Sequence, residues 1–158
     1  TAVEVAPHRA RLVEHAVRGL PVDVVCADGR EFDGGPFDRV LVDAPCTGLG
    51  ALRRRPEARW RRQPADLPPL TRLQRELLAA AVRLTRPGGL VAYVTCSPHV
   101  NETRVTVRET CRRVGVDVDL VDARPMLPDV PDLGGGPTVQ LWPHRHGTDA
   151  MFMALLHR

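Results

Sequence analysis

The apolar residues in the first part of the chain form short runs separated by one helical segment. Residues 2–5 and 22–26 have the pattern of short strands, and residues 37–42 form a nearly continuous apolar run, typical of a strand buried on both faces. Between the first two runs, Pro7 suits the first turn of a helix that continues over residues 9–18. Strand, helix and strand in this order predict a parallel sheet.

The second part of the chain continues this alternation. From Leu67 the apolar residues recur at helical spacing, and Pro-Gly-Gly at residues 87–89 is expected to end that helix before a buried strand over residues 90–94. The later segments predict a helix over residues 101–114, a strand over 116–121, and a final antiparallel pair made by 139–142 and 150–156. The whole predicts one α/β domain, residues 1–158, with a mostly parallel sheet and a C-terminal antiparallel strand.

Composition narrows the class of protein only modestly. No apolar run approaches the roughly 18 residues of a membrane span, and no secretory signal opens the sequence, so a cytoplasmic protein without a membrane partner is expected. All 22 basic residues are arginine, and the net charge of +3 suits a nucleic-acid partner. The four cysteines show no metal-ligand spacing, which predicts free thiols and no metal site.

Acids and cysteines follow the predicted strands. In open α/β sheets, ligands bind at the carboxyl ends of the strands. Glu4, Asp28, residues 43–46 and residues 95–98 occupy those positions, so we expect three acids and two cysteines to converge at one edge. Taken one at a time, each acid could instead cap the following helix, and a cysteine could be core packing.

Two motifs distinguish the cysteines from such ordinary packing. Asp-Ala-Pro-Cys-Thr-Gly-Leu-Gly at residues 43–50 and Thr-Cys-Ser-Pro at residues 95–98 resemble the two signature motifs of RNA cytosine-5 methyltransferases of the Sun (RsmB-like) family. The resemblance covers essentially the whole chain. It also includes the arginine-rich segment 53–60, the helical segment 73–78, residues 87–89, Asn101-Glu102 and residues 147–152.

The resemblance implies a Rossmann-like fold that uses S-adenosylmethionine and modifies RNA, specifically rRNA. It implies that Cys96 is the nucleophile that adds to carbon 6 of cytosine, since a thiolate can both add and leave. Cys46 is then expected to assist release of the methylated product, and Asp43 to contact the cytosine ring and take part in binding the cofactor. By position, Glu4 corresponds to the acid that binds the cofactor ribose and Asp28 to the residue beside its adenine.

The densest basic patch directly follows the first cysteine motif. Arg54, Arg55 and Arg59, with Trp60 beside them, are the expected RNA-binding residues, because arginines contact phosphates and an aromatic ring can stack on a base. A solvated loop in an arginine-rich protein is the alternative interpretation.

A comparison with the family also predicts a gap. The family places a strand and a glycine-rich cofactor loop before the segment that opens this sequence, and no such motif precedes Glu4. We therefore expect a fold that lacks its first strand and that loop, either because the chain is part of a longer enzyme or because another chain supplies them. The missing strand would lie between those that end at Glu4 and Asp43.

Two other functions remain open at this level. One is a non-catalytic RNA-binding or assembly module that keeps the methyltransferase fold. The other is a related methyltransferase acting on DNA or protein. DNA cytosine-5 enzymes carry their nucleophile in a Pro-Cys motif, which Pro45-Cys46 matches, and this makes Cys46 a competing nucleophile.

Overall fold

A five-stranded mixed sheet forms the centre of the protein. The structure, a computed structural model, describes all 158 residues. The strands run in the order β3-β4-β7-β5, and β6 also pairs with β7. Strands β3 and β4 pair in parallel, whereas β7 pairs antiparallel with β4, β5 and β6. The strands are β3 (Phe37–Asp43), β4 (Thr85–Thr95), β5 (Asp119–Val121), β6 (Val139–Gln140) and β7 (Phe152–His157).

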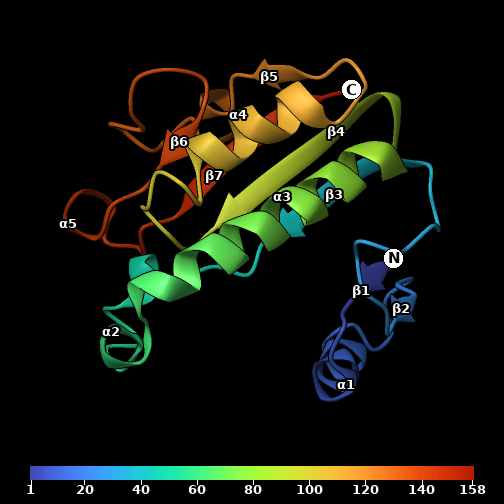
Figure 1. Cartoon of the computed structure of the whole chain (residues 1–158), viewed down its shortest axis with the longest axis horizontal. Coiled ribbons are helices and arrows are strands. Elements are labelled where there is room, and N and C mark those ends of the chain that lie inside the picture. Colours follow the sequence, from blue (N-terminus) through green and yellow to red (C-terminus); the bar gives the residue numbers. More distant parts are fainter.

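Two helices cover one face of this sheet (Figure 1). Helix α3 (Leu67–Leu84) begins with two prolines in its first turn, and α4 (Arg104–Arg113) packs beside it. Their apolar sides meet alternate residues of β4 and β7 because side chains of a strand alternate between its two faces. The resulting core contains Leu78, Val82, Val91, Tyr93, Val107, Phe152, Ala154 and Leu156.

A separate lobe holds the N-terminal elements. Strands β1 (Ala2–Val3) and β2 (Val24–Val25) pair in parallel with each other, and α1 (Pro7–Ala16) connects them. Neither strand pairs with β3, so the lobe lies to one side of the main sheet (Figure 1). The predicted strand, helix and strand are confirmed, although β2 is shorter than residues 22–26.

Short elements complete the chain. Between β3 and α3 lie the 3-10 turns η1 (Leu49–Ala51) and η2 (Pro64–Asp66), with the one-turn helix α2 (Ala58–Arg61) between them. The later connections contain η3 (Arg124–Met126) and α5 (Pro143–His146). None of the helices combines the length and apolar character that crossing a membrane requires.

Two expectations from the pattern need correction. Strand β3 is not buried on both faces, because it is the edge strand and its far face is open, leaving Leu41 69% exposed. Residues 87–89 do not end α3, which stops at Leu84; they form the irregular start of β4, where Gly88 has a φ of +79°. The expected C-terminal antiparallel strand is confirmed: β3, β4, β5 and β6 run in one direction, and β7 runs against them between β4 and β5.

Candidate active site

The two parallel strands carry the predicted cysteine motifs to one place. Asp43 ends β3, Cys96 follows β4, and Asp43 is aligned with Val94 in the parallel register. The loops after the two strands therefore leave the same edge of the sheet side by side. The Sγ atoms of Cys46 and Cys96 lie 3.4 Å apart, although the residues are 50 positions apart in sequence.

Gly50 lets these loops approach closely. Its N–H donates to the Cys96 carbonyl over 2.9 Å, and its own carbonyl accepts from the N–H of Ala150 over 2.9 Å. A Cβ at this position would meet the Ala150 carbonyl oxygen and lie 2.7 Å from the Cys96 carbonyl oxygen. The last glycine of the first motif is therefore required by backbone packing between three segments of the chain.

The contact between the two thiols shifts their pKa values in opposite directions. Hydrogen bonding from Cys46 lowers the pKa of Cys96 from 9.0 to about 7, against the opposing effects of burial and of the negative charges of Asp43 and Asp149. The same hydrogen bond, together with burial, raises the pKa of Cys46 well above its usual range. A thiol with this pKa is partly ionised at neutral pH, so a Cys96 thiolate forms there beside a protonated Cys46 thiol, as a nucleophilic cysteine requires.

Asp149 was not singled out from the sequence, although it lies in the segment 147–152 that carries the resemblance. It is 5% exposed and accepts 2.8 Å hydrogen bonds from Nε of both Arg53 and Arg54. Hydrogen bonding from Arg54 and Arg53 lowers the pKa of this carboxyl. These bonds fix the start of the arginine-rich segment beside the cysteine loops. The guanidinium of Arg54 is therefore already bound to an acid of the same chain.

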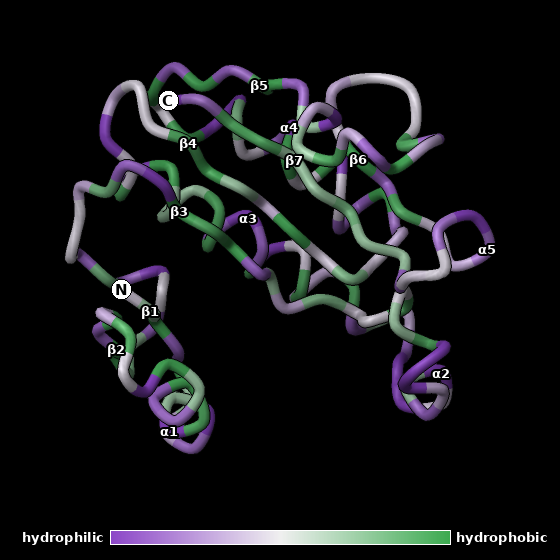
Figure 2. Tube along the Cα trace, turned by 180° about the vertical axis from the view of Figure 1, so that it is seen from behind, coloured by the Kyte–Doolittle hydropathy of each residue, from purple (hydrophilic) through white to green (hydrophobic).

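The other arginines of the segment divide into two groups. Arg62 donates to the carbonyls of Thr47 and Cys46 over 3.1 and 3.4 Å, so it holds the first cysteine loop. Arg55 and Arg59 are exposed, and Trp60 between them and Arg62 is 80% exposed. Figure 2 shows α2 as a strongly hydrophilic turn at the end of the molecule, in contrast to the apolar strands of the sheet.

The two predicted cofactor acids follow the strands of the N-terminal lobe, Glu4 after β1 and Asp28 after β2. Oε1 of Glu4 accepts from the Ala6 N–H over 2.8 Å and from Nε of Arg9 over 3.0 Å, while Oε2 has no partner in the protein. Both carboxylate oxygens of Asp28 are occupied by Arg30, whose hydrogen bonds lower the pKa of Asp28 to about 2. β1 and β3 share no hydrogen bonds, as expected if the missing strand lies between them, and the convergence of these two acids with the cysteines stays a prediction.

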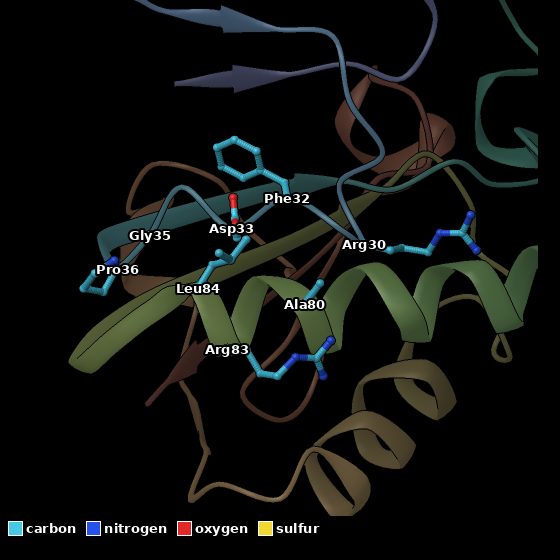
Figure 3. A pocket seen from close by; sticks show the side chains of 8 residues that line it. All are labelled: Arg30, Phe32, Asp33, Gly35, Pro36, Ala80, Arg83 and Leu84. Atoms are coloured by element: carbon cyan, nitrogen blue, oxygen red, sulfur yellow. The ribbon is translucent and has the colours of Figure 1, made fainter.

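A shallow hollow elsewhere on the protein is a less suitable candidate for the active site. It has a volume of about 330 Å³ and lies between the segment 30–36 and the end of α3 (Figure 3). Gly35 and Pro36 line it, so it lies at the amino end of β3, whereas Asp43 is at the carboxyl end of that strand. Ligands of open α/β sheets bind at the carboxyl ends of strands, and the hollow contains no cysteine.

Comparison with known proteins identifies the family of this chain. The model of the family described as "16S rRNA methyltransferase RsmB/F" matches residues 1–157. The protein Rv1407 of Mycobacterium tuberculosis strain H37Rv, named as a methyltransferase, is 64% identical over 160 residues, which is all of this chain and 35% of that protein. Ribosomal RNA small subunit methyltransferase B of Vibrio cholerae is 34% identical over 143 residues, or 88% of this chain and 31% of that protein.

Solved structures share the fold. The crystal structure of PH0851 superposes with a TM-score of 0.86 at 33% identity over 99% of this chain and 36% of that one. NSun6 from Pyrococcus horikoshii, solved with SFG, gives a TM-score of 0.83 at 27% identity over 99% of this chain and 40% of that one. The Rossmann-like α/β fold is confirmed, and this chain spans about a third of the length of the curated relatives it matches. The chain therefore belongs to the 16S rRNA methyltransferase RsmB/F family.

Proposed function

We propose that this chain contains the reaction centre of an enzyme that methylates carbon 5 of cytosine in rRNA through a covalent Cys96 adduct. The observation that carries the proposal is the contact between the Cys46 and Cys96 sulfur atoms at 3.4 Å. Carbon 5 of cytosine is a poor nucleophile until a group adds to carbon 6. A half-buried cysteine whose pKa is lowered to about 7 suits that addition.

Cys96, Asp43 and Cys46 each have a separate role in the proposed reaction. The Cys96 thiolate forms a bond to carbon 6, and the electron pair moves through the ring, where Asp43 holds a proton near N3. S-adenosylmethionine, when bound, supplies the methyl group that carbon 5 takes up. Water then takes the carbon 5 proton, the C–H electron pair forms the double bond between carbons 5 and 6, and the bond from carbon 6 to Cys96 breaks. Cys46 assists this release by donating a hydrogen bond from its thiol to the departing Cys96 thiolate. The lowered pKa makes Cys96 a good leaving group as well as a nucleophile.

The residues present fit the cofactor in part. The free Oε2 of Glu4 can accept a ribose hydroxyl, as expected from its place after β1. Asp28 can contact the adenine only if Arg30 moves, because Arg30 binds both of its carboxylate oxygens. The NSun6 structure solved with SFG, an S-adenosylmethionine analogue, supports the same cofactor for this chain.

RNA is the proposed substrate and the cytoplasm the proposed location. Arg55 and Arg59 make no ion pair with an acid, and they stand beside the exposed Trp60 on α2, immediately after the Cys46 loop. Phosphate contacts from these arginines and stacking by the indole would guide a flipped cytosine toward the thiols. Arg54 contributes indirectly, because Asp149 holds its guanidinium.

Methylation of rRNA by the complete protein tests the proposal. Incubation of unmodified small-subunit rRNA with S-adenosylmethionine should produce 5-methylcytosine, detected by mass spectrometry of the digested nucleosides. Cys96→Ala should abolish the product, whereas Cys26→Ala, which alters an exposed cysteine in the N-terminal lobe, should retain it. An active wild-type protein whose Cys96→Ala variant methylates equally well would refute the proposal, and RNA binding without any methylation would favour the non-catalytic module.

A further inference from the structure

A buried carboxylate links the two cysteine loops from beneath. Glu102 lies just before α4 and is 0% exposed. Both of its carboxylate oxygens accept hydrogen bonds from residues adjacent to the cysteines, although it contacts neither thiol through a hydrogen bond. A fully buried carboxylate is stable only when donors surround it. The identity of those donors shows what Glu102 does.

On the side of the first loop, Glu102 and Gln74 fix the backbone before and after Cys46. Thr47 donates its N–H to Oε1 of Glu102 over 2.8 Å and its hydroxyl to Oε2 over 2.5 Å. The side-chain amide of Gln74, itself 0% exposed, donates to Oε1 of Glu102 over 3.0 Å and to the Pro45 carbonyl over 2.8 Å. Both partners of this amide are acceptors, so its nitrogen faces them.

On the side of the second loop, Glu102 holds the residue that follows Cys96. The hydroxyl of Ser97 donates to Oε2 over 2.6 Å and accepts from the N–H of His99 over 3.1 Å. Tyr93, buried in β4 before the loop, donates its hydroxyl to the backbone carbonyl of Glu102 over 2.7 Å. Oε2 thus receives one hydroxyl from each cysteine loop, so Glu102 anchors both loops.

We propose that Glu102 is a positioning residue that sets the separation and orientation of the Cys46 and Cys96 thiols through Thr47 and Ser97. The inference rests on the proposed function for its catalytic consequence, but the geometry it describes can be measured without catalysis. Because Glu102 is buried under both loops, it acts through them and not on the substrate. The short contact between the thiols depends on two loops from different strands, and Glu102 is the side chain that bonds to both.

Three variants test the proposal. Glu102→Ala removes the anchor. Glu102→Gln keeps an acceptor toward the Thr47 N–H, and its amide can donate to the two hydroxyls, so it retains a neutral bridge. Glu109→Ala is the matched control, because Glu109 lies on α4 but forms ion pairs with surface arginines. Thermal unfolding of each variant shows which of them are folded.

The catalytic readout separates positioning from binding. In the complete protein, Glu102→Ala should lower kcat for RNA methylation by about 100-fold, the loss expected when reacting groups are misplaced by about 1 Å. Its KM for RNA should stay close to the wild-type value. Glu102→Gln should recover most of that kcat, and Glu109→Ala should match the wild type. Unchanged kcat in folded Glu102→Ala, or an effect confined to KM, would overturn the proposal.

A second readout works without methylation. A bifunctional thiol reagent that fluoresces only when both arms react should bridge Cys46 and Cys96 rapidly in the wild type, slowly in Glu102→Ala and at an intermediate to normal rate in Glu102→Gln. If Glu102→Ala fails to fold, Ser97→Ala replaces it, because that change removes the bond from Glu102 to the second loop but keeps both bonds from Thr47 to Glu102, and it should also slow bridging. Bridging at the wild-type rate in the folded variant would overturn the proposal. A wild-type protein that bridges its thiols but methylates no cytosine would refute only the proposed function.

Discussion

The N-terminal lobe and the cysteine edge of the main sheet differ in how their polar groups are held. In the lobe, Glu4 is bound by Arg9 and Asp28 by Arg30, partners five and two positions away. At the cysteine edge, the key contacts also join residues 50 to 96 positions apart, as in the pairs Cys46–Cys96, Thr47–Glu102 and Arg53–Asp149. Only Ala10 is buried among the first 36 residues, whereas the cysteine edge rests on the main core.

The difference has a physical meaning. Long-range contacts fix groups relative to the fold as a whole, whereas local contacts fix them only relative to their neighbours along the chain. The groups proposed to break and form bonds are therefore preorganised by the main sheet. Of the acids proposed to bind the cofactor, Glu4 is held within its own lobe, whereas the Arg30 that holds Asp28 also donates to Glu76 of α3 over 2.8 Å. The following predictions test this contrast.

The largest effect is expected at Gly50. Gly50→Ala places a methyl group against the carbonyl oxygens of Ala150 and Cys96, so the two cysteine loops must separate. Overpacking of this kind costs about 1–3 kcal/mol in stability, and the displaced thiols should lower the methylation rate by about 100-fold. Thermal unfolding and a single-turnover methylation assay measure the two effects. Gly135→Ala is the control, because a Cβ there meets nothing within 4 Å. Equal activity of both variants would show that the loops need no close approach.

The next effect concerns the cofactor. Glu4→Gln should weaken S-adenosylmethionine binding by about 10- to 100-fold, the range expected for loss of a hydrogen bond to a charged group. Arg9→Ala leaves Oε1 of Glu4 bonded only to the Ala6 N–H and should keep the affinity within about threefold of wild type, because the bond to a neutral hydroxyl needs only the carboxylate. Calorimetric titration of the complete protein measures both. Equal affinity of Glu4→Gln and the wild type would show that the acid only holds the start of α1.

A smaller effect is a shift along the pH axis. Since the pKa of Cys96 is lowered to about 7, its alkylation by iodoacetamide should rise as pH increases through 7, where the thiolate replaces the thiol. Cys46→Ala removes the hydrogen bond that is the main cause of this shift, so the midpoint should move up toward 9.0. Mass spectrometry of the Cys96 peptide follows the reaction. A midpoint that stays near 7 in Cys46→Ala would mean that another group stabilises the thiolate.

The smallest effect is expected at the surface arginines. Arg55→Ala with Arg59→Ala should weaken RNA binding several-fold and reduce the slope of log affinity against log salt by about 0.7 for each phosphate of single-stranded RNA that the variant no longer neutralises. Arg112→Ala with Arg113→Ala is the matched control, since both are exposed arginines on α4. Filter binding over a range of salt concentrations supplies the data. The same salt slope in the α2 variant and the wild type would identify the patch as solvated surface.

Much of the main sheet followed from the sequence because its pattern is local. The positions of β3, α3 and β7 follow from apolar runs and helical periodicity, and the final antiparallel pair is present as β6 and β7. The open face of β3 could not be predicted, because an apolar run does not state how many neighbours a strand has. The start of β4 at Thr85 was missed since Pro87 and two glycines are typical of a break.

The candidate site divides in the same way. The motifs predicted that Cys46 and Cys96 would meet, and the 3.4 Å contact confirms this proximity while their roles stay predictions. The predicted RNA role of Arg54 took no account of Asp149, because an ion pair between residues 95 positions apart leaves no periodic signal. The sequence indicated Glu102 only as part of a family motif. Its positioning role could not be predicted, because the sequence does not show that its carboxylate is buried between the two cysteine loops.

Trapping of the protein-RNA adduct tests the central claim most directly. The complete protein carrying Cys46→Ala or Cys96→Ala is incubated with S-adenosylmethionine and small-subunit rRNA, and the products are separated by denaturing electrophoresis. If Cys96 adds to carbon 6 and Cys46 assists release, a covalent protein-RNA band accumulates with Cys46→Ala and is absent with Cys96→Ala. The reverse pattern would make Cys46 the nucleophile, and methylation by Cys96→Ala at the wild-type rate without any adduct would contradict the covalent mechanism.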